Sequence, residues 1–190
     1  VRDYVFQGPP FVFRHRPGAL QTLRTHLCAE LALPEENVVI VGSAKIGFSL
    51  NPDTFPRRFS NESDIDVLIV DQGLFDKVWL TLLKWQYPRR IKGLDRPDAE
   101  WARERRKEVY WGWFVPDKIR YEGLSLPDVL KPLRDISTRW FNAFRGLGQY
   151  AALATRDVSG RLYRTWDHAL LYHVDGLSQI RERFRRREGG

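Results

Sequence analysis

The sequence predicts an α/β fold in which a small mixed β-sheet is surrounded by about five helices. Two short runs rich in β-branched residues, at 38–41 and 63–70, have the length and composition of buried strands. Several longer segments place apolar residues three or four positions apart, as helices with one buried face do. With 43% hydrophobic residues in 190 and no sharp boundary, we expect one domain over residues 1–190, with a helical lobe at about 95–150.

Caps, breakers and apolar spacing define the remaining elements. Proline is favoured in the first turn of a helix and excluded from its interior, so prolines mark both ends of the first long helix. Aspartate followed by an apolar run indicates an N-cap. In order, we expect an irregular or extended arm at 1–16, a helix at 17–33, a strand at 38–41, a short helix at 44–48, a strand at 63–70, a helix at 74–87, a basic turn at 88–93, a helix at 97–109, an aromatic cluster at 110–114, a helix at about 126–150, a strand at 161–166 and a last helix capped by Asp167.

Two acidic residues open the second strand. Asp64 and Asp66 are two positions apart, so in a strand they point to the same face, about 6–7 Å from each other. At an effective dielectric constant near 20, two such charges repel by roughly 2–3 kcal/mol. A hard cation between them would remove this repulsion, so the pair predicts a Mg²⁺ or Mn²⁺ site. A pair of strand-entry residues at a solvated edge is the alternative.

A glycine–serine turn follows the first strand. Gly42 allows a sharp turn or a close approach of a ligand, because it has no Cβ atom. If a short helix follows, its free N–H groups, the Ser43 hydroxyl and Lys45 would form an anion site. A solvated surface position explains Lys45 at least as well.

These residues together resemble the signature of the DNA polymerase β-like nucleotidyltransferase superfamily, including its minimal, antitoxin-type and bacterial defence-type members. The resemblance rests on Gly42-Ser43 after a strand and on Ser63-Asp64-Ile65-Asp66 at the start of the next, and it covers about 35 residues. It implies that the turn holds a nucleoside triphosphate and that Asp64 and Asp66 bind metal ions. The segment between the two motifs is longer than in most minimal members, and it could fold over the nucleotide or be passive.

The resemblance also implies a third metal-binding carboxylate on a later strand. The expected strand at 161–166 contains no acidic residue, and Asp167 follows its end directly. We therefore take Asp167 as the candidate third ligand, although its position also suits a helix N-cap. His168 and His173 are five positions apart, which is not the spacing of a helical zinc pair, so we expect them to be surface or core histidines.

The composition favours a polyanionic partner. Lysine and arginine total 31 against 24 aspartates and glutamates, which gives a net charge of +7. Basic residues at 97–109 beside the aromatic cluster at 110–114 could grip a base or an RNA strand. Packing between two helical elements explains the cluster as well, and we favour that explanation.

Cysteine usage and hydropathy predict a cytoplasmic protein without a membrane segment. The single cysteine, Cys28, excludes an internal disulfide and fits a reducing compartment. No run is long and apolar enough to span a membrane, and no signal peptide opens the chain. Methionine is absent, so we expect that Val1 is not the translated start.

The function that we expect is Mg²⁺-dependent transfer of a nucleoside monophosphate from an NTP to a hydroxyl or phosphate acceptor, with release of pyrophosphate. The acceptor could be a nucleotide, an RNA or DNA end, or a protein. The alternative is a catalytically weak member of the same fold that binds RNA or a protein partner, as an antitoxin does. The resemblance also admits members active in antiviral defence, and the residues do not choose among these possibilities.

Overall fold

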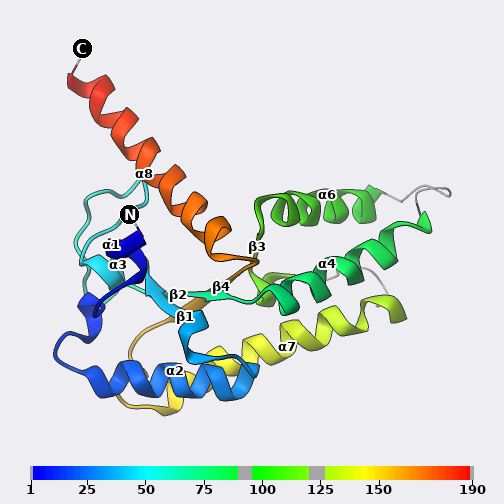
Figure 1. Cartoon of the computed structure of the whole chain (residues 1–190), viewed down its shortest axis with the longest axis horizontal. Coiled ribbons are helices and arrows are strands. Elements are labelled where there is room, and N and C mark those ends of the chain that lie inside the picture. The colour runs from blue at the N-terminus through cyan, green and yellow to red at the C-terminus, as the bar shows by residue number, and fades with distance from the viewer. Residues whose placement is uncertain (1, 90–95, 120–126, 189–190) are drawn as a thin grey trace.

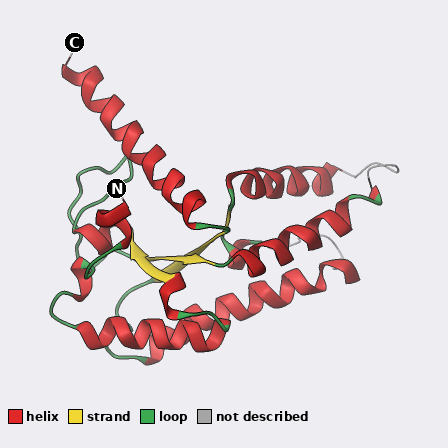
Figure 2. Cartoon of the chain, in the orientation of Figure 1, coloured by secondary structure: helices red, strands yellow, loops and turns green. Residues whose placement is uncertain are grey.

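A four-stranded mixed sheet forms the centre of the protein. The computed structural model describes residues 2–89, 96–119 and 127–188. Within them the strands are β1 (Val38–Val41), β2 (Ile65–Val70), β3 (Trp113–Phe114) and β4 (Val158–Tyr163), in the spatial order β1-β2-β4-β3. β1 is antiparallel to β2, β2 is parallel to β4, and β3 is antiparallel to β4. Figure 2 shows this sheet between the helices.

Seven α-helices accompany the sheet in the described part of the chain, and the mixed α/β class expected from the sequence is confirmed. Two of them, α1 and α3, have only five residues each. The α-helices are α1 (Arg2–Phe6), α2 (Pro17–Leu31), α3 (Gly42–Ile46), α4 (Gln72–Gln86), α6 (Arg96–Trp111), α7 (Lys131–Gly146) and α8 (Trp166–Glu188).

The alternation of side chains along β2 divides the core into two parts. Ile65, Val67 and Ile69 belong to the larger cluster, which the helices α2, α4, α6 and α7 complete. Leu68 and Val70 point the other way, into a smaller cluster that includes residues of α1 and the start of α8. In Figure 1, α4, α6 and α7 extend from the sheet in one direction, whereas α8 projects from it in another. The sheet is therefore covered on both faces.

β2 is the central strand because its sequence suits burial on both sides. Every β2 residue except Asp66 is buried, and both of its edges are paired, to β1 and to β4. Its start is also fixed by the backbone, because the amide of Ile65 donates to the carbonyl of Asp157 at 2.8 Å. The two aspartates thus stand at the beginning of a strand that is otherwise enclosed.

Several expected boundaries differ from those observed. The arm at 1–16 contains α1 and a 3₁₀ turn at Phe11–Phe13, and the aromatic cluster contains the short strand β3. The strand expected at 161–166 is β4, three residues earlier, and α8 begins at Trp166. The expected N-cap role of Asp167 is therefore wrong, because this residue is already in the first turn of α8. Most of the expected basic turn, and the start expected at residue 126 for the helix there, lie outside the described residues.

None of the helices in the described ranges has the length and apolar character that crossing a lipid bilayer requires.

The position of β4 depends on a glycine at its centre. A Cβ atom on Gly160 would lie 2.2 Å from Cζ of Phe144, which packs on the sheet from α7. Gly148 is the control position, because a Cβ atom there would have open space around it. We expect Gly160→Ala to lower the free energy of unfolding by about 1–3 kcal/mol, since the added methyl group overpacks the core.

Urea unfolding followed by circular dichroism measures this loss, and Gly148→Ala should change the stability by less than about 0.5 kcal/mol. Equal midpoints for the two variants would mean that β4 does not lie against Phe144.

Candidate functional site

One polar cleft brings together four of the residues that the sequence singled out. Gly42 and Ser43 line it from the start of α3, and Asp64 and Asp66 line it from the start of β2. The opposite wall comes from α8 and from the segment between α3 and β2. We call it the aspartate cleft; its volume is about 570 Å³. The other lining residues are Ser49, Leu50, Asn51, Pro52, Asp53, Thr54, Arg57, Ser63, Tyr172, His173, Asp175, Gly176 and Gln179.

Gly42 and Asp66 are in direct contact. The backbone of Gly42 is left-handed, with φ of 64°, which a residue with a side chain adopts only under strain. A Cβ atom at this position would also lie 2.6 Å from Oδ2 of Asp66. The pairing of Val41 with Asp66 across β1 and β2 explains this proximity. The glycine is needed for both the turn and the space that the carboxylate occupies.

The environment of Asp66 disfavours its charge. Atoms packed around the carboxyl group remove part of its hydration and raise its pKa, and the neighbouring charge of Asp64 raises it further. Arg161 and the Ser159 hydroxyl act in the opposite direction, the latter from 3.5 Å. The residue remains partly open to the cleft, so solvent limits the size of the effect. Asp64 and Asp66 therefore form a like-charged pair that faces a cavity.

Lys45 is in a different place from the one expected for a phosphate contact. Its side chain is buried, and its Nζ atom donates to the backbone carbonyls of Gln7 and, at 2.6 Å, Gly8. Burial, with a smaller contribution from Arg24, lowers its pKa. The structure does not bring Lys45 to the aspartate cleft; it uses the ammonium group to hold the N-terminal segment against α3.

Asp167 also lies outside the lining of the cleft. It is exposed in the first turn of α8, whereas Asp175 is in the cleft wall eight residues later, about 12 Å along the helix axis. On β4, the residue opposite Asp66 is Ser159, which cannot supply a carboxylate. Of these two residues of α8, the structure thus places Asp175, and not Asp167, in the cleft that Asp64 and Asp66 line, and Asp53 lines it as well.

The spacing of residues in α8 is a sequence signal for this wall of the aspartate cleft, and it was not part of the prediction above. Polar or small residues recur on α8 at the spacing of one helix face: Tyr172, Asp175, Gly176 and Gln179. The Asp175 carboxylate accepts a hydrogen bond of 2.8 Å from Gln179. His173 belongs to the same wall; burial and Arg161 lower its pKa to about 4, so it is neutral at pH 7.

The segment between α3 and β2 is fastened to α8. Phe55 makes edge-to-face contacts with Phe48 and with Phe184 of α8, at 5.9 and 5.6 Å between ring centroids. Arg183 donates to the carbonyl of Pro52 at 2.6 Å and to the carboxylate of Asp53 at 2.7 Å. This segment therefore forms a wall of the aspartate cleft together with α8.

The carboxylates of the aspartate cleft suit a divalent metal cation better than the single charge of a lysine or arginine side chain. Four aspartates line the cleft, Asp53, Asp64, Asp66 and Asp175, and Arg57 is the basic residue among its described lining residues. Oxygen ligands of this kind are those that Mg²⁺ and Mn²⁺ prefer. Among the described residues, no group of three or more His, Cys, Asp or Glu side chains is close enough to hold a metal ion. The pair would therefore need further oxygen ligands from a substrate or from water.

Comparison of this chain with protein-family models, with curated proteins and with solved structures finds no match.

The raised pKa of Asp66 predicts how the stability depends on pH. The folded protein binds the Asp66 proton more tightly than the unfolded chain does. This group therefore stabilises the fold below the ordinary carboxyl pKa, and that stabilisation is lost as the pH rises through the folded pKa. In metal-free buffer at pH 7, Asp66→Asn should unfold at a higher urea concentration than the native protein, and the difference should shrink as the pH falls through the folded pKa.

Asp135→Asn, which removes an exposed charge on α7, is the matched control and should leave the midpoint unchanged at both pH values. A lower midpoint for Asp66→Asn at pH 7 would show that the carboxylate is stabilised, not destabilised, by its surroundings.

Proposed function

We propose that this protein is a metal-dependent nucleotidyltransferase of the DNA polymerase β-like type. The observation that carries the proposal is the close approach of Gly42 to the Asp66 carboxylate, in an open cleft that Ser43 and Asp64 also line. Two motifs more than twenty residues apart in sequence are adjacent in space, at the end of β1 and the start of β2. A solvated-edge explanation for the two aspartates would not require this proximity.

Asp64 and Asp66 would hold Mg²⁺ or Mn²⁺. The fit rests on their shared cleft and on the raised pKa of Asp66, whose charge is disfavoured by burial and by the neighbouring Asp64. Once bound, such an ion supplies charge neutralisation at a phosphate and lowers the pKa of an attacking hydroxyl group. Asp175 faces the pair across the cleft, where it could contact a second ion or a coordinated water molecule.

The rest of the cleft would bind and orient the substrates. The Gly42-Ser43 turn offers a hydroxyl group and a backbone without a Cβ atom beside the carboxylates, which suits a triphosphate chain. Arg57 contributes a positive charge to the opposite wall, and Tyr172 contributes an aromatic ring. The reaction would transfer a nucleoside monophosphate from an NTP to an acceptor hydroxyl or phosphate, with pyrophosphate as the leaving group. Positioning and electrostatics would account for most of the rate.

A second candidate function follows from the residues around the aspartate pair. Ser159 stands opposite Asp66, and Lys45 is engaged with the backbone, so the cleft has fewer charged groups than the motif implies. The outer part of α8 exposes a row of arginines, which suits a polyanion. A catalytically weak protein that binds RNA or a protein partner would use these features. The exposed arginines are Arg181, Arg183, Arg185 and Arg186.

Metal binding can be measured without any turnover. At a free Mg²⁺ concentration ten times its dissociation constant, a ligand that binds only the folded state adds about 1.4 kcal/mol of stability. This should raise the Tm of the native protein by about 4 °C, whereas Asp64→Asn/Asp66→Asn should show no shift. Differential scanning fluorimetry with Mg²⁺, Mn²⁺ and EDTA makes the measurement. An equal shift in the double variant would place the ion elsewhere.

Turnover distinguishes the two candidate functions. With each of the four NTPs, Mn²⁺ or Mg²⁺ and cellular RNA or protein as acceptor, the native protein should release pyrophosphate. Asp64→Asn/Asp66→Asn should lower that rate by about 100-fold or more, because the metal site is lost. Asp135→Asn should retain the full rate. RNA binding that falls with salt and survives in the double variant, without pyrophosphate release by either protein, would favour the binding function.

The aspartates Asp167 and Asp175 of α8 provide a paired comparison. Asp175→Asn should reduce pyrophosphate release by about tenfold or more, whereas Asp167→Asn should leave it within about twofold, since only Asp175 lines the cleft. The opposite order would restore Asp167 as the third carboxylate and would require α8 to be rotated relative to the position described above.

A further inference from the structure

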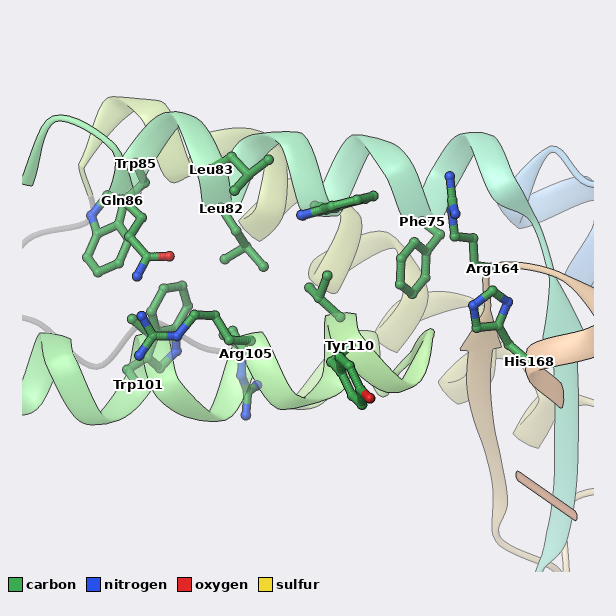
Figure 3. A pocket seen from close by; sticks show the side chains of 14 residues that line it. Phe75, Leu82, Leu83, Trp85, Gln86, Trp101, Arg105, Tyr110, Arg164 and His168 are labelled. Atoms are coloured by element: carbon green, nitrogen blue, oxygen red, sulfur yellow. The ribbon is translucent and has the colours of Figure 1, made fainter. Parts of the chain in front are cut away.

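A second cavity lies between α4 and α6, away from the aspartate cleft. The two helices contact each other through Trp85 and Trp101, and an open pocket of about 420 Å³ lies between them. Figure 3 shows α4 on one side and α6 on the other, with side chains of both directed into the space between them. We call it the α4–α6 cavity. Its lining residues are Phe75, Trp79, Leu82, Leu83, Trp85, Gln86, Trp101, Ala102, Arg105, Arg106, Val109, Tyr110, Arg164 and His168.

Aromatic rings form much of the wall of the α4–α6 cavity. Trp85 of α4 and Trp101 of α6 meet edge to face at 5.1 Å at the end far from the sheet. Phe75 lies near the sheet end, and Tyr110 lies on α6 beside it, where its side chain is 78% exposed. These rings give the cavity an apolar lining, and the exposed Tyr110 ring can pack against a planar group.

The polar groups of the cavity are predominantly cationic. Arg105, Arg106 and Arg164 line it, and none of its described lining residues is an aspartate or a glutamate. The acidic partners of Arg105 and Arg164, which are Glu108 and Asp76, lie outside the lining. Two of the three guanidinium groups are thus already paired with a carboxylate, and the exposed Arg106 adds the third.

Two of these arginines are held in place. Arg164 donates from Nε to Asp76 at 2.9 Å, and its guanidinium lies 5.6 Å from the ring centroid of Trp79. Arg105 pairs with Glu108 at 3.2 Å, but its Nε–H is buried and has no hydrogen-bond partner within the described chain. Figure 3 shows the Arg105 side chain in the space between the helices. A buried donor without a partner is costly unless a ligand accepts its hydrogen bond.

From these features we propose that the α4–α6 cavity binds a free mononucleotide, with its base against the aromatic rings and its phosphate on the arginines. The volume lies in the range of about 300–1,000 Å³ that is usual for small-ligand sites. Arginine suits phosphate because its planar group donates two parallel hydrogen bonds. Arginines and aromatic rings thus occur together in one pocket between two helices, and its volume suits a single nucleotide.

This site is distinct from the aspartate cleft, and it does not depend on the function proposed for that cleft. The two cavities share no lining residue. His168, in the first turn of α8, lines the α4–α6 cavity, and Tyr172, one turn later, lines the aspartate cleft. A nucleotide in the α4–α6 cavity would therefore be a second ligand and not the substrate of the metal site.

Binding of AMP tests the proposal. Titration by isothermal calorimetry, with tryptophan fluorescence as a second readout, should use the full chain carrying Asp64→Asn/Asp66→Asn in EDTA, so that the metal site contributes nothing. We expect saturable AMP binding with a dissociation constant below about 1 mM. Binding should be about tenfold weaker for adenosine, which lacks the phosphate, and for pyrophosphate, which lacks the base and the ribose. GMP, CMP and UMP in parallel would report any base preference.

Matched variants locate the site. Arg106 is exposed and lines the cavity, and Arg103 is exposed on the same helix but does not line it. Arg106→Gln should weaken AMP binding by about fivefold, and Arg103→Gln should leave it within about twofold. Val109→Trp, which fills the cavity, should abolish binding while circular dichroism and the Tm show a folded protein.

Three results would overturn the proposal. The first is no saturable binding of AMP at millimolar concentrations, and the second is unchanged affinity in Val109→Trp. The third is tighter binding of a single-stranded oligonucleotide than of AMP, weakened equally by Arg103→Gln and Arg106→Gln. This last result would indicate a nucleic-acid surface along the outside of α6.

Discussion

Two negative charges at the one open end of a buried strand are the constraint around which the protein is arranged. β2 is paired on both edges and covered on both faces, so only its beginning meets solvent. Any group that must reach Asp66 has to approach from that end. Gly42, the segment fastened to α8 and α8 itself are the elements that surround this opening. The cleft exists because the sheet leaves no other route to the charged residues.

Helix α8 contacts three different parts of the structure. Its first turn packs on the sheet, its middle forms a wall of the aspartate cleft, and its outer part holds the segment between α3 and β2 through Arg183 and Phe184. Arg161 of β4 connects these regions, because its guanidinium lies over the rings of Trp113 and Tyr172 at 4.6 and 4.5 Å. Burial and charge at the cleft are thus determined by residues that are remote from it in sequence.

The sequence was sufficient for those parts of the structure that local patterns encode. The strands at 38–41 and 65–70 and the helices α2 and α4 follow from apolar spacing and caps, and the Gly42-Ser43 turn with the two aspartates follows from a short motif. The bounds predicted for β4 were three residues too late, because Ser159 and Gly160 lack strand propensity. Their place in the strand is determined by pairing with β2 and by the ring of Phe144. The contact of Lys45 with Gln7 and Gly8, and the position of Asp175, depend on how distant segments meet, which no local pattern contains.

The parallel pairing of β2 with β4 has a consequence for how the molecule assembles. Asp66 and its neighbour Ser159 are 93 residues apart in the chain, and the segment between them includes α4, α6 and α7. Closing so long a loop is entropically costly and slows folding. During synthesis, β2 would therefore keep an unpaired apolar edge until the β4 residues, Val158–Tyr163, had left the ribosome. Such an unpaired apolar edge favours association between incomplete chains, so fragments that end before β4 should aggregate more readily than the full sequence.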